Sequence, residues 1–146
     1  MPPRRLDPAK VRAALDAQLS ALGEPAFTGP DPAVPGACVA AVLGAYAGGH
    51  EPLKDAARFA VRHLLDELAA LTPGRTVEVR VPPYAAVQCV EGPRHTRGTP
   101  PNVIETDPRT WLELATGRVS WEAALAAGRI AASGSRADLS AYLPLR

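Results

Sequence analysis

Residues 74–90, Gly74-Arg-Thr-Val-Glu-Val-Arg-Val-Pro-Pro-Tyr-Ala-Ala-Val-Gln-Cys-Val90, begin the half of the chain that is expected to form a β-sheet, after a helical first half. Valines alternate with charged residues over 77–81, which is the period of a strand with one buried and one solvated face. The two prolines Pro82-Pro83 end this strand. Residues 85–90 are then apolar on both faces except for Gln88, which is typical of a central strand covered on two sides. The stretch therefore predicts two strands, paired through a reversal at the prolines.

Downstream of this hairpin, the residues predict a long connection followed by short strands and helices. The connection, 91–101, contains prolines and glycines that interrupt both helix and strand. Asp107-Pro108 is typical of a helix opening, because aspartate accepts a hydrogen bond from a first-turn amide and proline gives up no helical donor. Ser120 has the same capping capacity. The predicted elements are a strand over 102–106, a helix closed by Gly117, a helix closed by Gly128, a strand over 129–133, and a last helix with Leu139, Tyr142 and Leu143 on one face.

The N-terminal half has helical periods separated by a segment rich in proline. Apolar residues repeat at helical spacing over 7–22 and over 53–71. Between them, 23–35 carries four prolines, which predict an extended linker without a continuous helix. Residues 37–47 form a short apolar run that fits either a buried helix or a buried strand, and a helix ended by Gly48-Gly49 is favoured.

Length and composition predict one folded domain in water. The chain has 146 residues, enough for a single hydrophobic core, with a helical half over 1–73 and a sheet half over 74–146. Hydrophobic residues make up 47% and charged residues 21%, which is typical of soluble globular chains rather than of disordered or membrane-embedded ones. The net charge of +1 supplies no basic field for nucleic acid, so we expect no nucleic-acid partner.

Two segments bear on location. The first residues lack the apolar run that a secretory signal requires, and the most apolar run, 37–47, is shorter than a bilayer span. We therefore expect a cytoplasmic protein with no stable insertion in a membrane. Cys38 and Cys89 lie far apart in apolar surroundings and form no C-x-x-C pair, which indicates reduced core residues.

The sequence carries no motif for catalysis. No serine, cysteine or threonine stands in a convincing pattern with a histidine and an acid. The histidines, His50, His63 and His95, lack metal-ligand spacing. We therefore expect no metal, no cofactor and no enzyme activity.

A cationic loop has two possible interpretations, as a binding site or as a solvated structural segment. Arg94, His95 and Arg97 lie over 91–98 with two glycines that let backbone amides approach a ligand. The loop either holds a carboxylate or phosphate, or is a solvated segment whose cations pair with nearby glutamates.

Two tryptophans also admit two interpretations. Trp111 and Trp121 follow the two predicted helix openings, about ten positions apart, where they face the sheet. They either pack in the core or form the wall of an apolar cavity.

The order of motifs in the C-terminal half carries a resemblance. The runs are Asp107-Pro-Arg-Thr-Trp-Leu-Glu-Leu-Ala-Thr-Gly117, Ser120-Trp-Glu-Ala-Ala-Leu125 and Gly128-Arg-Ile-Ala-Ala-Ser-Gly134. This order resembles the sterol carrier protein fold, in which D-x-x-x-[WF]-x-x-[LM]-x-x-G is followed by a second helix and a strand that ends in glycine. With Thr76–Pro83 and His95–Val103, the pattern is similar to the bacterial branch called sterol carrier family protein, over about 75–145.

This resemblance implies an α+β fold. The expected architecture is a sterol-carrier-like sandwich, with a small, mostly antiparallel sheet, helices packed on one face, and N-terminal helices before it. The resemblance also implies that the protein binds or carries a fatty acyl chain, a sterol or another lipid in an apolar tunnel between sheet and helices, without catalysis. A head group would lie near Arg94, His95 and Arg97. The positions that correspond to the tunnel lining, together with the second tryptophan, are Val79, Val87, Ile104, Trp111, Leu112, Leu114, Trp121, Leu125, Ile130, Leu139 and Leu143.

Two other functions stay open at this point. Alanine-rich N-terminal helices that packed on another protein, or on a second copy in a homodimer, would make the chain an interaction module with a solid core. Maleylpyruvate isomerase-type proteins join a similar domain to a metal-binding helical domain. That metal needs several histidines, and the N-terminal half offers only His50 and His63.

Overall fold

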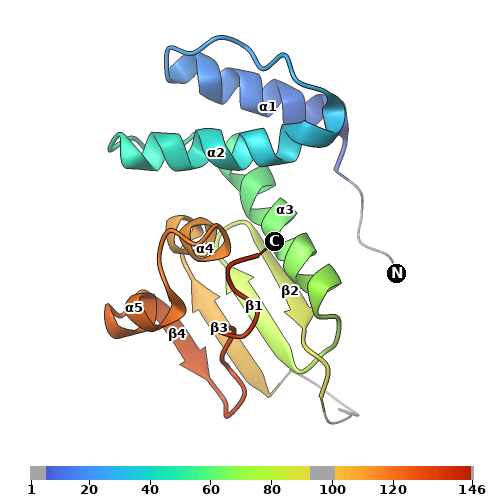
Figure 1. The fold of residues 1–146 in the computed structure, drawn as a ribbon, viewed down its shortest axis with the longest axis vertical. Coiled ribbons are helices and arrows are strands. Elements are labelled where there is room, and N and C mark those ends of the chain that lie inside the picture. Colours follow the sequence, from blue (N-terminus) through green and yellow to red (C-terminus); the bar gives the residue numbers. More distant parts are fainter. Residues whose placement is uncertain (1–5, 93–100, 146) are drawn as a thin grey trace. The chain divides into compact units, whose positions relative to one another are not determined.

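The computed structural model describes residues 6–92 and 101–145. In these ranges helices come first, and strands with two further α-helices follow (Figure 1). The chain divides into two compact units, residues 1–63 and 64–146, and one helix runs through the division. The elements in order are α1 (Pro8–Ala21), a 3-10 turn (Asp31–Ala33), α2 (Val34–Ala47), α3 (Lys54–Leu71), β1 (Val77–Val81), β2 (Ala85–Cys89), β3 (Asn102–Thr106), α4 (Pro108–Ala115), α5 (Trp121–Ala126) and β4 (Ile130–Ser133).

In the first unit, α1 anchors the proline-rich segment that follows it. Arg12 donates hydrogen bonds to the carbonyl oxygens of Phe27 (3.1 Å) and Gly29 (2.8 Å), and pairs with Asp31 at 2.8 Å. These bonds satisfy carbonyl groups that an isolated extended segment would leave to water. The predicted linker therefore has a fixed path along α1.

The segment predicted as either helix or strand is α2, a helix, as favoured. It begins at Val34 and so takes in the last two residues of the predicted linker, and a 3-10 turn precedes it. Pro35 is tolerated there because the first turn of a helix has no partner for its N–H groups. Cys38 of α2 donates through Sγ to the carbonyl oxygen of Ala56 in α3, at 3.4 Å.

The second unit contains a mixed, mostly antiparallel sheet with the strand order β2-β1-β3-β4. Val79 lies opposite Val87 in the antiparallel β1–β2 pair and opposite Ile104 in the parallel β1–β3 pair. The β3–β4 pair is again antiparallel. Together with the helices, this sheet confirms the predicted α+β class.

Burial alternates along the central strands, so one face of the sheet carries the helical cover. Val77, Val79 and Val81 are buried, whereas Glu78 and Arg80 point to the other face and pair with each other. This pattern is the period-two arrangement that the sequence predicted for 77–81.

The prediction that 85–90 forms a central strand is wrong. The strand β2 pairs only with β1 and is an edge strand, in which Ala86 and Gln88 are exposed and Val87 is half-buried. Small alanine side chains made the segment look apolar on both faces although one face meets solvent. The strand also ends at Cys89, because Val90 turns into the left-handed region at φ 69°.

The predicted last helix is absent from the described residues 137–145, which form turns. Asp138 uses its carboxylate to accept a hydrogen bond from the Ser140 amide at 2.8 Å, which is local bonding that competes with a helix. Pro144 has no amide to donate. The Leu145 amide instead donates to the carbonyl oxygen of Ala115, so the segment returns to the end of α4.

Candidate ligand-binding site

The buried face of the sheet carries the lining residues that the sequence predicted on strands. Val79 and Ile104 lie opposite each other and are 0% and 1% exposed, and Ile130 of β4 is buried on the same face. Val87 shares this face by register but is half-buried, because it lies on the edge strand. Four of the predicted lining residues therefore share one face of the sheet.

The helix α4 presents three more of the predicted residues. Asp107 accepts hydrogen bonds from the Thr110 amide (2.9 Å) and hydroxyl (2.8 Å), so α4 starts where the sequence placed it. Its turns then bury Trp111, Leu112 and Leu114 to 2% exposure or less.

The helix α5 places its two predicted residues differently. Ser120 accepts a hydrogen bond from the Ala123 amide at 3.1 Å, which confirms the predicted cap. Trp121 is buried, but Leu125 is 45% exposed and points away from the interior. The structure therefore does not bring Leu125 to the other candidate residues.

The C-terminal segment closes one side of a hollow next to these helices. Leu139 is buried, and Leu143 is half-buried. Leu114, Trp121 and Leu143 line a cavity of about 190 Å³ together with Ser120, Glu122, Ser140 and Pro144. Two consecutive helices and the C-terminal segment thus meet around one partly apolar space.

A polar cluster beside α4, which the sequence analysis did not identify, fixes the start of β4. Glu113 pairs with Arg129 and, at 3.2 Å, with Arg109, while Arg129 Nε donates to the Thr110 hydroxyl at 3.0 Å. Thr106 donates to the carbonyl oxygen of Arg129 at 2.8 Å. The Arg109–Glu113 spacing was a readable signal of a helical ion pair, whereas nothing in the sequence linked Arg129 to either residue.

Two opposing effects act on the Glu113 carboxyl group. Burial raises its pKa, but hydrogen bonds from Arg129 and Arg109 and the charges of both guanidinium groups lower it. The net result is a pKa below the ordinary value of 4.5, so the group is a carboxylate at neutral pH. It therefore serves as a fixed acceptor for two arginines.

A second hollow, of about 340 Å³, lies at the junction of β3 and β4. Glu105, Asp107 and Arg129 line it together with Ile130, which is the one predicted lining residue there. Asp107 and Arg129 already have partners in the cap of α4 and in the polar cluster. This hollow is therefore mixed in charge.

The predicted head-group residues Arg94, His95 and Arg97 lie outside the described residues. The predicted core cysteines, Cys38 and Cys89, are buried free thiols. In the described ranges, no group of three or more histidine, cysteine, aspartate or glutamate residues has the arrangement of a metal site. Within those same ranges, every helix is too short or too polar to cross a bilayer.

Comparison with protein families covers this site. Residues 54–145, more than half of the chain, match the model of a family described as bacterial SCP ortholog. The match includes all of α3 and every element of the sheet. No curated protein matches the chain.

Proposed function

The chain belongs to the family of bacterial SCP orthologs, which confirms the resemblance to sterol carrier proteins, and on this basis we propose that it binds and carries a hydrophobic small molecule. The proposal is non-enzymatic: the ligand is held and released unchanged. The observation that carries it is the meeting of Leu114, Trp121 and Leu143 around one cavity inside the region that matches the family.

Burial of methylene groups supplies the affinity in this proposal. Each methylene that leaves water for an apolar pocket contributes about 0.8 kcal/mol, so ~12 of them contribute ~10 kcal/mol before costs. Loss of ligand freedom costs ~4 kcal/mol or more, which leaves roughly micromolar binding. No specific polar contact is needed for this result.

The cavity volume determines how a chain-like ligand enters. A cavity of about 150 Å³ holds benzene, and small-molecule sites generally span about 300–1,000 Å³. The observed 190 Å³ therefore accommodates only part of a lipid chain. We propose that the rest of the space arises when residues 140–144 move, because this segment is held mainly at its ends, by buried Leu139 and by the Leu145–Ala115 hydrogen bond.

Titration of the delipidated protein with a fluorescent fatty acid tests the proposal. We expect saturable binding that unlabelled lipid competes away, with a change in the emission of Trp111 and Trp121. Leu143→Phe should weaken binding about tenfold by filling the cavity, whereas Leu71→Phe, at a 57% exposed leucine outside the cavity, should not. The absence of a saturable, competable change in tryptophan emission would overturn the proposal.

A further inference from the structure

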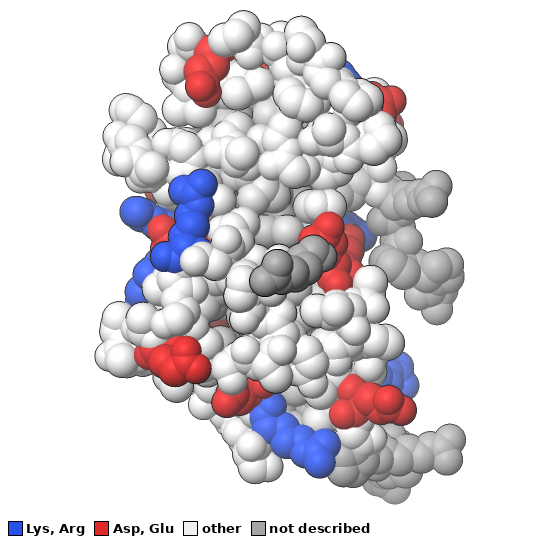
Figure 2. Space-filling view, in the orientation of Figure 1, with Lys and Arg blue, Asp and Glu red and all other residues white. Residues whose placement is uncertain are grey.

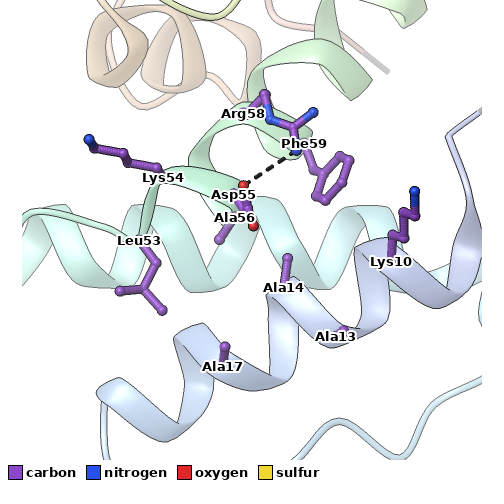
Figure 3. Close-up of a pocket in the computed structure, with 10 residues that line it drawn as sticks. All are labelled: Lys10, Ala13, Ala14, Ala17, Leu53, Lys54, Asp55, Ala56, Arg58 and Phe59. Atoms are coloured by element: carbon purple, nitrogen blue, oxygen red, sulfur yellow. Dashed lines mark hydrogen bonds and ion pairs between the residues drawn. The ribbon is translucent and has the colours of Figure 1, made fainter.

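A groove in the first unit, separate from the cavity described above, has the features of a second ligand site. Its volume is about 600 Å³, and all of its lining residues belong to α1 or to the segment from Leu53 to Phe59 (Figure 3). None of them lies in the second unit. The volume is in the middle of the range of small-molecule sites.

The floor of the groove is made of small apolar side chains. Ala13, Ala14 and Ala17 lie along one side of α1, and Ala56 faces them from α3 (Figure 3). Alanine gives an apolar surface that occupies little space, so the groove stays open between α1 and the first turns of α3.

Two large apolar side chains complete the walls. Leu53 and Phe59 project from the α3 side of the groove (Figure 3). Leu53 is 42% exposed, which leaves apolar surface that a bound chain would cover. The Leu53 amide donates to Oε1 of buried Gln18 in α1 at 2.7 Å, so the two walls are fixed to each other at this end.

The rim of the groove is cationic. The chain has only two lysines, Lys10 and Lys54, and both line this groove with Arg58. Asp55 is the acidic residue of the lining and is paired with Arg58 at 3.3 Å. Among the residues that the structure describes, no ion pair neutralises either lysine. The site therefore presents an apolar floor and an excess of positive charge.

From the floor and the rim we infer that this groove binds a single-chain anionic amphiphile, with its chain over the alanines and its head group at one of the two lysines, which lie at opposite ends of the groove (Figure 3). A protein partner is a poorer fit, because a standard protein interface uses about 20–30 residues on each side and only ten line the groove. The inference does not rest on the cavity of the second unit.

The lysines also supply a direct probe. Reductive methylation with ¹³C-formaldehyde keeps the charge of lysine and labels only Lys10, Lys54 and the terminal amine. Titration with palmitate should shift one or both lysine methyl signals saturably. Methyl palmitate, which lacks the charge, should shift them at least about tenfold less effectively. Lysophosphatidic acid of the same chain length distinguishes a phosphate head group from a free carboxylate.

Matched variants test the two parts of the site. Reversing each lysine separately, Lys10→Glu or Lys54→Glu, leaves the other lysine as a methyl probe. Reversal of the lysine that holds the head group should weaken the response of the remaining signal to palmitate about tenfold, whereas Arg75→Glu or Arg118→Glu changes the net charge equally at an exposed site elsewhere and should not. Both lysines lie in first turns of helices, where glutamate is favourable, so these variants should stay folded. Ala17→Phe should block the groove, and Ala40→Phe, at an exposed alanine of α2, should not.

Several results would overturn the inference. Lysine signals unmoved by palmitate at its solubility limit would do so, as would equal responses to palmitate and its methyl ester. Signals that shift with protein concentration alone would indicate a second copy in the groove instead. Because both tryptophans lie in the second unit, their emission reports the other cavity separately, so failure of either proposal is recognisable by itself.

Discussion

At Glu113, two arginines stabilise the charged carboxylate by more than burial destabilises it. Its folded-state pKa is below the ordinary value of 4.5, so its contribution to stability is present above about pH 5. The contribution is lost as the pH falls through the lowered pKa, where the carboxyl group takes up a proton in the folded state too. The group thus makes part of the stability of the second unit depend on pH.

Replacement of Glu113 tests this pH dependence. We expect Glu113→Gln to lower the free energy of unfolding by about 1–2 kcal/mol at pH 7, because two arginines lose their charged partner. The difference from the unmodified protein should shrink towards zero in acid. Urea unfolding at pH 7 and pH 3 measures it, with Glu51→Gln at an exposed loop position as the control. A difference that is equal at both pH values contradicts the prediction.

The two thiols illustrate the effect of burial without a compensating partner charge. Burial raises the pKa of Cys38 and of Cys89 to about 11. At pH 8 only about one thiol in a thousand is then a thiolate, the reactive form. We expect a disulfide reagent such as dithionitrobenzoate to modify neither thiol quickly in the folded protein and both quickly in denaturant. Fast modification of the folded protein at pH 8 would show this expectation to be wrong.

At the scale of elements, one buried amide joins two parts of the sheet region. Asn102, 2% exposed at the start of β3, donates to the carbonyl oxygen of Thr76 at 3.0 Å and accepts from the Arg136 amide at 2.8 Å. The first bond reaches the residue before β1, and the second reaches the segment after β4. Asn102 therefore fixes loops on either side of the strands.

Loss of this amide should be costly. We expect Asn102→Ala to destabilise the protein by about 2–4 kcal/mol, because a buried carbonyl and a part-buried amide lose their partners. Gln88→Ala, at an exposed position of edge strand β2, should change stability by less than about 0.5 kcal/mol. Thermal unfolding of both variants makes the comparison. Equal midpoints would show that water replaces both hydrogen bonds.

Helices and strands with a strong period or a capping residue were predictable from the sequence, and contacts between distant segments were not. The caps Asp7, Asp107 and Ser120 and the valines of β1 act locally, so their effects can be read from adjacent residues. The edge position of β2 depends on which strands pair, which a local pattern does not contain. Likewise, the apolar residues over 139–143 have helical spacing, but the terminal segment forms turns. Its amides donate to the Asp138 carboxylate and to the carbonyl oxygen of Ala115 at the end of α4 instead of forming a helix.

The burial of the candidate site residues was predictable in the same uneven way. Buried positions such as Val79, Ile104 and Trp111 follow from strand and helix periods, and they are buried in the structure. Leu125 has the right residue type, but α5 buries Trp121 and Ala124 and leaves Leu125 on its exposed side. The sequence did not predict the groove beside α1, because alanine and lysine are common on the exposed surfaces of helices. Only the tertiary structure brings Leu53 and Phe59 opposite them.

At the scale of the whole molecule, the prediction of a single domain can be tested by comparing two spectroscopic signals. Both tryptophans lie in the second unit, whereas helices of both units contribute to circular dichroism at 222 nm. If the chain unfolds as one cooperative domain, the two signals should follow the same urea transition. A tryptophan transition with a different midpoint would show that the two units unfold separately, contrary to this prediction.

The helix α3 has a practical consequence for anyone who divides this chain into fragments. Its first turns bury Ala56 and Phe59 in the first unit, and its later turns bury Leu65 and Leu68 in the second. A fragment that starts at Lys54, where the family match begins, keeps the helix but strips the cover from its first turns. A cut after His63 would instead leave each piece with half of a helix. Fragments made at either position should therefore be less soluble than the full chain, because each cut exposes apolar surface of α3.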